Sequence, residues 1–230
     1  MRYLLLLSLI TIMSCGKDSK DMTVKGQIKG LQKGTIYLKK ANDSTIVIVD
    51  STKVNGTSTF EMYADINSPE MFFIELDKTT KADERLSFFG NKGITEINTT
   101  LKDFAFKAKI KGSKQQDLVE EYIATISKFN DRNIDLLKEK VDAFNANDTT
   151  AYKKAEAKLS NATKSKYLFT TNFAVNHKDS EVAPYLALTE IYDANISLLD
   201  TINNSLTKEI KASKYGMALD KYITKIKSEK

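Results

Sequence analysis

The spacing of apolar residues changes once along the chain, at Gly112, and this change most limits what the chain can fold into. Before it, apolar and polar residues alternate over short runs interrupted by glycines, a pattern typical of antiparallel strands. After it, apolar residues recur every three or four positions, as on one face of a helix. The sequence therefore predicts an α+β protein: an N-terminal antiparallel β-sandwich or open barrel followed by a C-terminal antiparallel helical bundle.

Residues 23–112 are expected to form the β-sandwich domain from a series of short strands without an intervening helix. The run 45–49 (TIVIV) is apolar on both faces, which predicts a central strand. Asn55 and Gly56 tolerate positive φ, so we expect a hairpin turn there. The alternating run 104–110 predicts a last strand before the helices.

Residues 113–230 are expected to form the helical domain. Ser113 followed by Gln116 matches a capping box at the start of its first helix, and Asp148 is expected to cap a long helix further on. The apolar stripes predict the core faces of the bundle. One of these stripes, in a helix expected to follow the first, consists of Ile134, Leu137, Val141 and Phe144.

The N-terminus predicts where the protein is located. Arg2 precedes an apolar run that is shorter than the ~20 residues of a membrane-spanning helix, so residues 1–14 are typical of a signal peptide. Residues 12–15 (IMSC) resemble the lipobox of bacterial lipoproteins, in which a small residue precedes the cysteine that receives the lipid. Cys15 is the only cysteine of the chain, which favours lipidation over an ordinary secretory signal.

Lipidation of Cys15 implies a thioether-linked diacylglycerol and an amide-linked fatty acyl chain such as palmitate. Each buried methylene contributes about 0.8 kcal/mol, so two or more chains hold a protein stably on a membrane. Residues 15–22 are expected to form a flexible lipidated tether. We therefore expect a lipid-anchored protein of the cell envelope, on the outer membrane, with the periplasmic or surface side left open.

The net charge of +5 does not indicate nucleic-acid binding. Arginine is the preferred residue for phosphate and base recognition, yet beyond the signal peptide only Arg85 and Arg132 are arginines. The lysines are dispersed among 30 acidic residues, as on a solvated surface. The expected partners are the membrane, through the N-terminal lipid, and an envelope protein, with no nucleic acid.

Five short segments carry a resemblance to a known family: 24–30 (VKGQIKG), 34–38 (GTIYL), 49–51 (VDS), 54–60 (VNGTSTF) and 111–113 (KGS). They resemble domain of unknown function 4369. That family occurs in Bacteroidetes lipoproteins, commonly as the N-terminal accessory region of thiol–disulfide oxidoreductases of the TlpA/ResA kind. The resemblance extends to residues 176–182 (NHKDSEV). In the fused relatives, a helix similar to residues 214–222 leads into a thioredoxin domain with a C-x-x-C pair, whereas this chain stops at Lys230.

The sequence does not supply the residues of several common chemistries. Thiol–disulfide exchange needs an attacking and a resolving sulfur, and Cys15 is committed to lipid. His177 is the only histidine, which excludes a multi-histidine metal site, and we expect it on the surface of a loop. The chain also has no Gly-x-Ser-x-Gly elbow and no P-loop. We therefore predict no catalytic residue, no cofactor and no metal site, and a non-catalytic module that binds a partner or ligand.

Two other functions stay open on the sequence alone. One is an envelope glycan-active enzyme with a carboxylate site between the domains. The other is a truncated thiol–disulfide oxidoreductase whose catalytic domain is lost or encoded downstream.

Several Asp-Ser and Asp-Thr pairs resemble the acceptor used for O-glycosylation of exported Bacteroidetes proteins. The same pairs also serve as turns and helix caps. The candidate O-glycosylation sites are Ser44, Ser51, Thr149 and Thr201.

Overall fold

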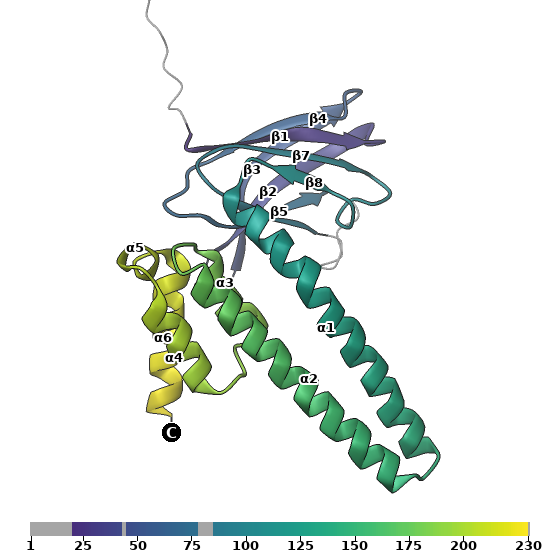
Figure 1. Ribbon diagram of the computed structural model, residues 1–230. Coiled ribbons are helices and arrows are strands. Elements are labelled where there is room, and N and C mark those ends of the chain that lie inside the picture. The colour runs from purple at the N-terminus through teal and green to yellow at the C-terminus, as the bar shows by residue number, and fades with distance from the viewer. Residues whose placement is uncertain (1–19, 43–44, 78–84, 230) are drawn as a thin grey trace, which may run out of the picture.

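The computed structural model describes residues 20–42, 45–77 and 85–229. A β-rich unit lies at one end of the molecule, and the helices extend away from it (Figure 1). The predicted α+β class and the order of its two parts are confirmed. The predicted signal peptide, Cys15 and Ser44 lie outside the described residues.

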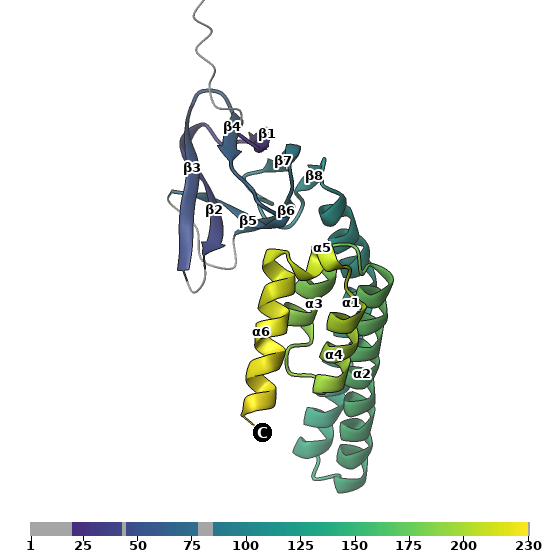
Figure 2. The same ribbon diagram turned by 90° about the vertical axis from the view of Figure 1, so that its left-hand side faces the viewer.

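In the described residues, eight strands form two four-stranded sheets that face each other (Figure 2). The first, sheet A, has the order β4-β1-β7-β8, and the second, sheet B, has the order β3-β2-β5-β6. Sheet A consists of β4 (Thr59–Ala64), β1 (Met22–Lys29), β7 (Gly93–Thr100) and β8 (Lys109–Lys111). Sheet B consists of β3 (Thr45–Asn55), β2 (Lys33–Asn42), β5 (Glu70–Leu76) and β6 (Leu86–Gly90). All paired strands are antiparallel except β1 and β7, which run parallel.

Alternate residues of both sheets point inward and form the core of the sandwich. Val24 and Ile28 of β1 and Ile36 and Leu38 of β2 are completely buried there. The core also includes Met22, which is fully buried as the first residue of β1. Met22 was predicted to belong to the flexible tether. That prediction was wrong, because the Met22 side chain is part of the sandwich core.

Three expectations about the strands were wrong. The run 45–49 belongs to β3, which is an edge strand of sheet B, and Ile46 and Ile48 are exposed. Gly56 has the expected positive φ of 89°. However, β3 pairs with β2 and β4 pairs with β1, so this turn connects the two sheets and does not form a hairpin. Residues 101–107 form turns, and only Lys109–Lys111 pair as β8.

The helical part begins with two long helices, α1 (Lys114–Asn145) and α2 (Thr149–Asn176). Four shorter helices follow: α3 (Val182–Glu190), α4 (Ile196–Ser205), α5 (Lys208–Lys211) and α6 (Lys214–Ser228). Ser113 Oγ accepts from Gln116 N at 3.2 Å and Asp148 Oδ1 from Ala151 N at 2.9 Å, which confirms both predicted N-caps. No helix among the described residues combines the length and apolar composition needed to cross a bilayer.

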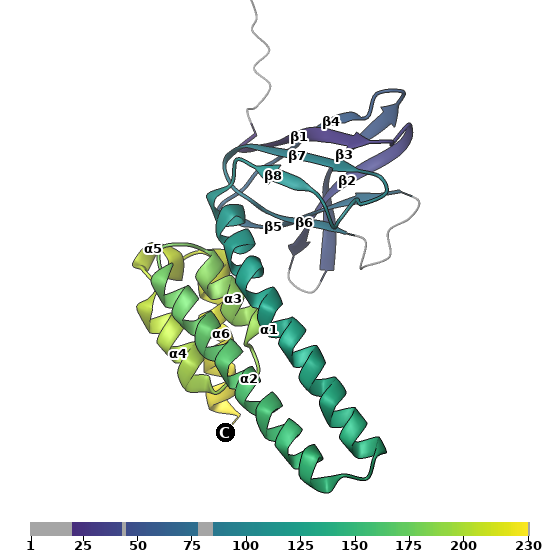
Figure 3. The same cartoon turned by 45° about the vertical axis from the view of Figure 1, so that its right-hand side comes forward.

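Helices α1 and α2 run side by side as a hairpin that extends beyond the other helices (Figure 3). The sequence predicted a break within α1, but the helix is continuous over 32 residues. The residues of α1 buried against its neighbours include Tyr122, Ile126, Leu136 and Ala143. Ile134, Leu137, Val141 and Phe144, which were expected in the core, are exposed instead.

The edge strand β6 joins the sandwich to the helices through Phe89. The side-chain oxygen of Gln116 accepts a hydrogen bond from Phe89 N at 2.9 Å, so Gln116 does not complete the expected capping box with Ser113. The Phe89 ring is completely buried and lies 5.5 Å from the ring of Tyr185 and 5.9 Å from that of Tyr215. One apolar cluster therefore contains residues of both parts of the molecule.

The start of α6 makes polar contacts with strand β5. The hydroxyl of Tyr215 accepts from Met71 N at 3.0 Å, and burial raises the pKa of this phenol. The buried carboxylate of Glu70 pairs with Lys214 and, at 3.0 Å, with Lys40 of β2. A buried carboxylate needs such partners because burial removes its hydration.

Gly26 of β1 cannot carry a larger side chain without moving a neighbouring strand. A Cβ atom at this position would lie 1.7 Å from the carbonyl oxygen of Ile97 on β7. We expect Gly26→Ala to lower the free energy of unfolding by roughly 3 kcal/mol or more, measured by urea denaturation. Lys29→Ala, at an exposed position of the same strand, is the control and should change it little. Equal stability of the two variants would contradict the close approach of β1 and β7.

The bond from Met71 to Tyr215 gives a second prediction. Tyr215→Phe keeps the ring but leaves Met71 N–H without its acceptor, so we expect a loss of about 1–3 kcal/mol in unfolding free energy. Tyr192→Phe, at an exposed tyrosine, should cost less than about 0.5 kcal/mol. Chemical denaturation of both variants measures the difference, and an unchanged Tyr215→Phe protein would show that this bond does not stabilise the junction.

Candidate functional site

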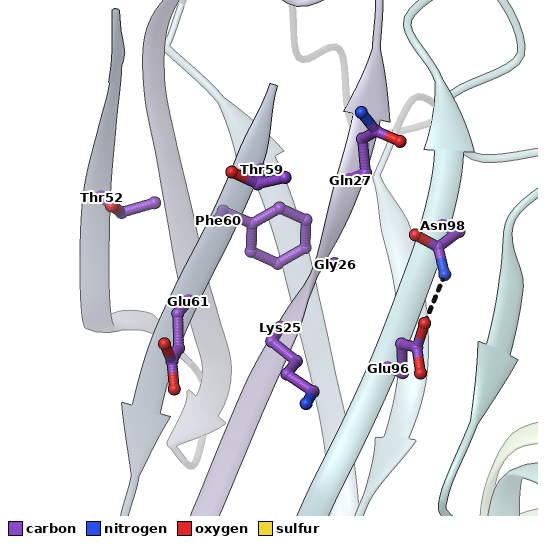
Figure 4. Close-up of a pocket in the computed structure, with 9 residues that line it drawn as sticks. All are labelled: Lys25, Gly26, Gln27, Thr52, Thr59, Phe60, Glu61, Glu96 and Asn98. Carbon is purple, nitrogen blue, oxygen red and sulfur yellow. Dashed lines mark hydrogen bonds between the residues drawn. The ribbon is translucent and has the colours of Figure 1, made fainter. Parts of the chain in front are cut away.

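The outer face of sheet A is hollowed into an open groove of about 600 Å³ (Figure 4). Strands β4, β1 and β7 form its floor, and Thr52 of β3 lies at its edge. Its polar lining residues are Lys25, Gln27, Thr52, Thr59, Glu61, Glu96 and Asn98. The groove is therefore built from side chains that point outward from the sandwich.

Strand register brings opposite charges together across the groove. Lys25 on the central strand β1 lies opposite Glu61 of β4 and opposite Glu96 of β7. Glu96 in turn lies opposite Lys111 of β8, so acidic and basic residues alternate across all four strands. Directly opposite charges on one sheet face attract by roughly 0.2–1 kcal/mol per pair. This row holds Lys25 between two carboxylates, as Figure 4 shows.

A second row, next to the first, carries amides and a hydroxyl. Gln27 of β1 lies opposite Thr59 of β4 and Asn98 of β7. The side-chain nitrogen of Asn98 donates to Glu96 Oε1 at 2.9 Å, and that of Gln27 donates to Ser58 Oγ at 2.9 Å. These bonds hold both amides in defined orientations and leave their carbonyl oxygens able to accept.

Tyr63 lies on the same face of β4 as Glu61, two residues further along the strand and outside the groove. A hydrogen bond with the Glu61 side chain is the main cause that raises the pKa of Tyr63, and partial burial adds to it. A phenol is protonated at neutral pH even at its ordinary pKa, so Tyr63 provides another hydroxyl on this face.

The groove is suited to a polar ligand with many hydrogen-bonding groups. Its carboxylates accept, its amides and hydroxyls both donate and accept, and Lys25 donates. Glu61, Glu96 and Lys25 together carry a charge of about −1 at pH 7, so a strongly charged ligand is not favoured. The arrangement fits an uncharged ligand rich in hydroxyl groups.

The three candidate O-glycosylation sites within the described residues lie on separate parts of the surface. Ser51 is exposed on β3, Thr149 is the exposed first residue of α2, and Thr201 is exposed on α4. The hydroxyl of Thr201 donates to the carbonyl of Ser197 at 2.7 Å. The structure does not bring these residues together, and their modification stays a prediction.

His177 lies in the turn that follows helix α2, as expected for a loop residue, but its side chain is half-buried and not fully on the surface. Its Nδ1 lies 2.9 Å from the carbonyl oxygen of Phe173, and its ring is 4.3 Å from the Phe173 ring. Both contacts fix the end of the helix. Within the described part of the chain, no three His, Cys, Asp or Glu residues are grouped as a metal site requires.

The groove was not identified from the sequence. Its residues alternate with buried ones along β1 and β7, and such alternation is typical of any solvated sheet face. The signal that brings them together is register, above all the parallel pairing of β1 with β7. These strands are far apart in the sequence, so alternation alone does not show that they are neighbours.

The fold and groove define a β-sandwich with an open polar face and an attached helical unit. Residues 22–119 match the model of a family described as "Domain of unknown function (DUF4369)". The match covers all eight described strands and extends into α1 beyond Gln116, which confirms the resemblance for the N-terminal part of the chain. No curated protein and no solved structure matches the chain.

Proposed function

We propose that this protein is a non-catalytic lipoprotein of the cell envelope that binds a polar ligand in the groove on the outer face of sheet A. The observation that carries the binding role is the charged row in which Lys25 lies between Glu61 and Glu96. The lipobox at Cys15 and the match of residues 22–119 support the envelope location, because the resembling family occurs in lipoproteins.

The chemistry of the groove favours an envelope glycan as the ligand. A glycan has many hydroxyl groups that both donate and accept, and the groove offers carboxylates, amides and hydroxyls within one face. Hydrogen bonds to charged groups contribute about 1.5–3 kcal/mol, so the carboxylates supply the stronger contacts.

The proposed lipid anchor keeps this groove near a membrane. Strand β1 begins at Met22, so residues 16–21 are all that separate it from Cys15. Six residues reach at most about 20 Å. The sandwich, and not the helical hairpin, is therefore the part of the protein held close to the lipid surface.

The glycan-active enzyme with carboxylates between the domains is the alternative. Glu70 at the junction is paired with Lys40 and Lys214, and Glu181 accepts from Gln115 Nε2 at 3.0 Å. Both carboxylates are buried and have partners, which favours a structural role for them. For the truncated oxidoreductase, the test is whether the DNA downstream encodes an in-frame C-x-x-C domain.

The location is tested by two variants, one that removes the lipidation site and one that keeps it. Cys15→Ser removes the acceptor sulfur, so we expect a folded protein in the soluble fraction after ultracentrifugation of the lysed native host. Ser14→Ala keeps a small residue before the cysteine and should leave the protein on the membrane. A Cys15→Ser protein that sediments with the membrane would overturn the lipid anchor.

The groove is tested by binding of defined oligosaccharides from the host envelope, measured by microarray and then by calorimetry. We expect Glu61→Gln and Glu96→Gln each to weaken binding about tenfold, because each loses a charged hydrogen-bond acceptor. Glu121→Gln, at an exposed acid on α1, is the matched control and should bind as the wild type does. No binding to any glycan, or the same loss in the control, would argue against a glycan site in the groove.

A further inference from the structure

The distal half of α1 presents an apolar stripe that the described residues leave uncovered. Ile134, Leu137, Val141 and Phe144 follow one another at intervals of three and four, so they share one face of the helix. Their exposed fractions are 66%, 52%, 48% and 70%. Single exposed apolar residues are common on protein surfaces, whereas a continuous stripe marks an interaction site.

This stripe adjoins a face of α1 that is already occupied. Leu136 and Ala143, one residue before Leu137 and Phe144, are buried in the described structure, where α1 packs against α2. Ion pairs join α1 to α2 here: Lys140 with Glu156 at 2.9 Å, and Glu139 with Lys158 at 2.8 Å. Helix α1 therefore has two adjoining apolar faces, of which α2 covers one.

The free side of the stripe is acidic. Asp131, Asp135 and Asp142 flank it together with Lys138, for a net charge of about −2 at pH 7. None of these four makes an ion pair within the part of the chain that the structure describes. The flank is thus unlike the chain as a whole, whose net charge is +5.

A hollow lies at the end of the stripe, at the tip of the hairpin. It measures about 500 Å³ and is lined by Ala143, by Phe144 of the stripe and by Tyr152 of α2, together with the polar residues Asn147, Asp148 and Thr149. The rings of Phe144 and Tyr152 are 6.3 Å apart. Such a hollow suits a bulky apolar side chain of a partner, which is the usual form of an anchor at a protein interface.

We propose that the distal half of α1 is the docking site for an amphipathic helix of another envelope protein, one whose apolar face is flanked by lysine or arginine. The partner helix lays its apolar residues on the stripe and places a bulky one in the hollow at the tip. Its basic residues pair with Asp131, Asp135 and Asp142. This site is separate from the groove on sheet A and does not depend on glycan binding; only the choice of an envelope protein as the partner rests on the proposed location.

Charge decides between this partner and two other occupants. A second copy of the chain presents the same acidic flank, so two stripes in contact repel each other. An anionic membrane surface attracts basic segments and repels an acidic one. A basic helix gains attraction from the charges that disfavour both alternatives.

The test uses the full-length protein in mild detergent and two labelled synthetic helical peptides. Both peptides carry the same leucine stripe with one phenylalanine, and they differ only in having lysines or glutamates beside the stripe. Fluorescence anisotropy measures binding. We expect the lysine peptide to bind at least tenfold more tightly than the glutamate peptide, with an affinity that falls as salt is raised.

Variants locate the binding on the protein. Leu137→Ser combined with Val141→Ser should weaken binding of the lysine peptide at least tenfold without changing the unfolding midpoint, because both residues are exposed. Asp135→Asn with Asp142→Asn should remove the preference for the lysine peptide. Leu168→Ser, at an exposed apolar position of α2, is the matched control and should change nothing.

Three outcomes would overturn the proposal. One is that neither peptide binds, and another is that both bind equally. The third is that the protein dimerises in analytical ultracentrifugation, the double serine variant abolishes the dimer, and no peptide binds. In that case, a second copy is the occupant of the stripe.

Discussion

The rest of the structure depends on the buried backbone N–H of Phe89 having a hydrogen-bond acceptor. Phe89 lies on β6, at the edge of sheet B, and a buried edge must find partners for its backbone groups. The side chain of Gln116 provides the acceptor, and it does so from the first turn of α1, which Ser113 caps. The Phe89 ring then enters the apolar cluster of the helices. One strand residue thus belongs to the sheet through its backbone and to the helical core through its side chain.

The helical part shows what apolar spacing can and cannot predict. Ser113 and Asp148 were identified as caps because capping depends on local hydrogen bonds. The stripe with Ile134 and Leu137 was assigned to the core because it is the more apolar of two adjoining faces of α1. The face that packs on α2 includes Lys140, whose ion pair with Glu156 lets a charged residue lie beside a buried seam. Spacing identifies faces, but only packing decides which of them is covered.

The strands show a similar limit. Alternation predicted a sandwich or open barrel, and two facing sheets are present. The position of each strand within its sheet was harder to predict. The apolar run of β3 has the composition of a central strand, yet β3 lies at an edge. The groove depends on the pairing of β1 with β7, and no local pattern encodes a contact between segments so distant in sequence. The sequence therefore did not predict which strands pair when they are far apart along the chain.

Because α6 contacts β5, the sandwich gains all of its contacts only after α6 has been synthesised. Met71 and Glu70 receive Tyr215 and Lys214 from a segment 144 residues further on. Until α6 has been synthesised, the carboxylate of Glu70 has only Lys40 as an ion-pair partner, and the backbone N–H of Met71 is bonded to water. A nascent chain therefore stays incompletely folded until α6 has emerged. Such long-range closure also slows folding.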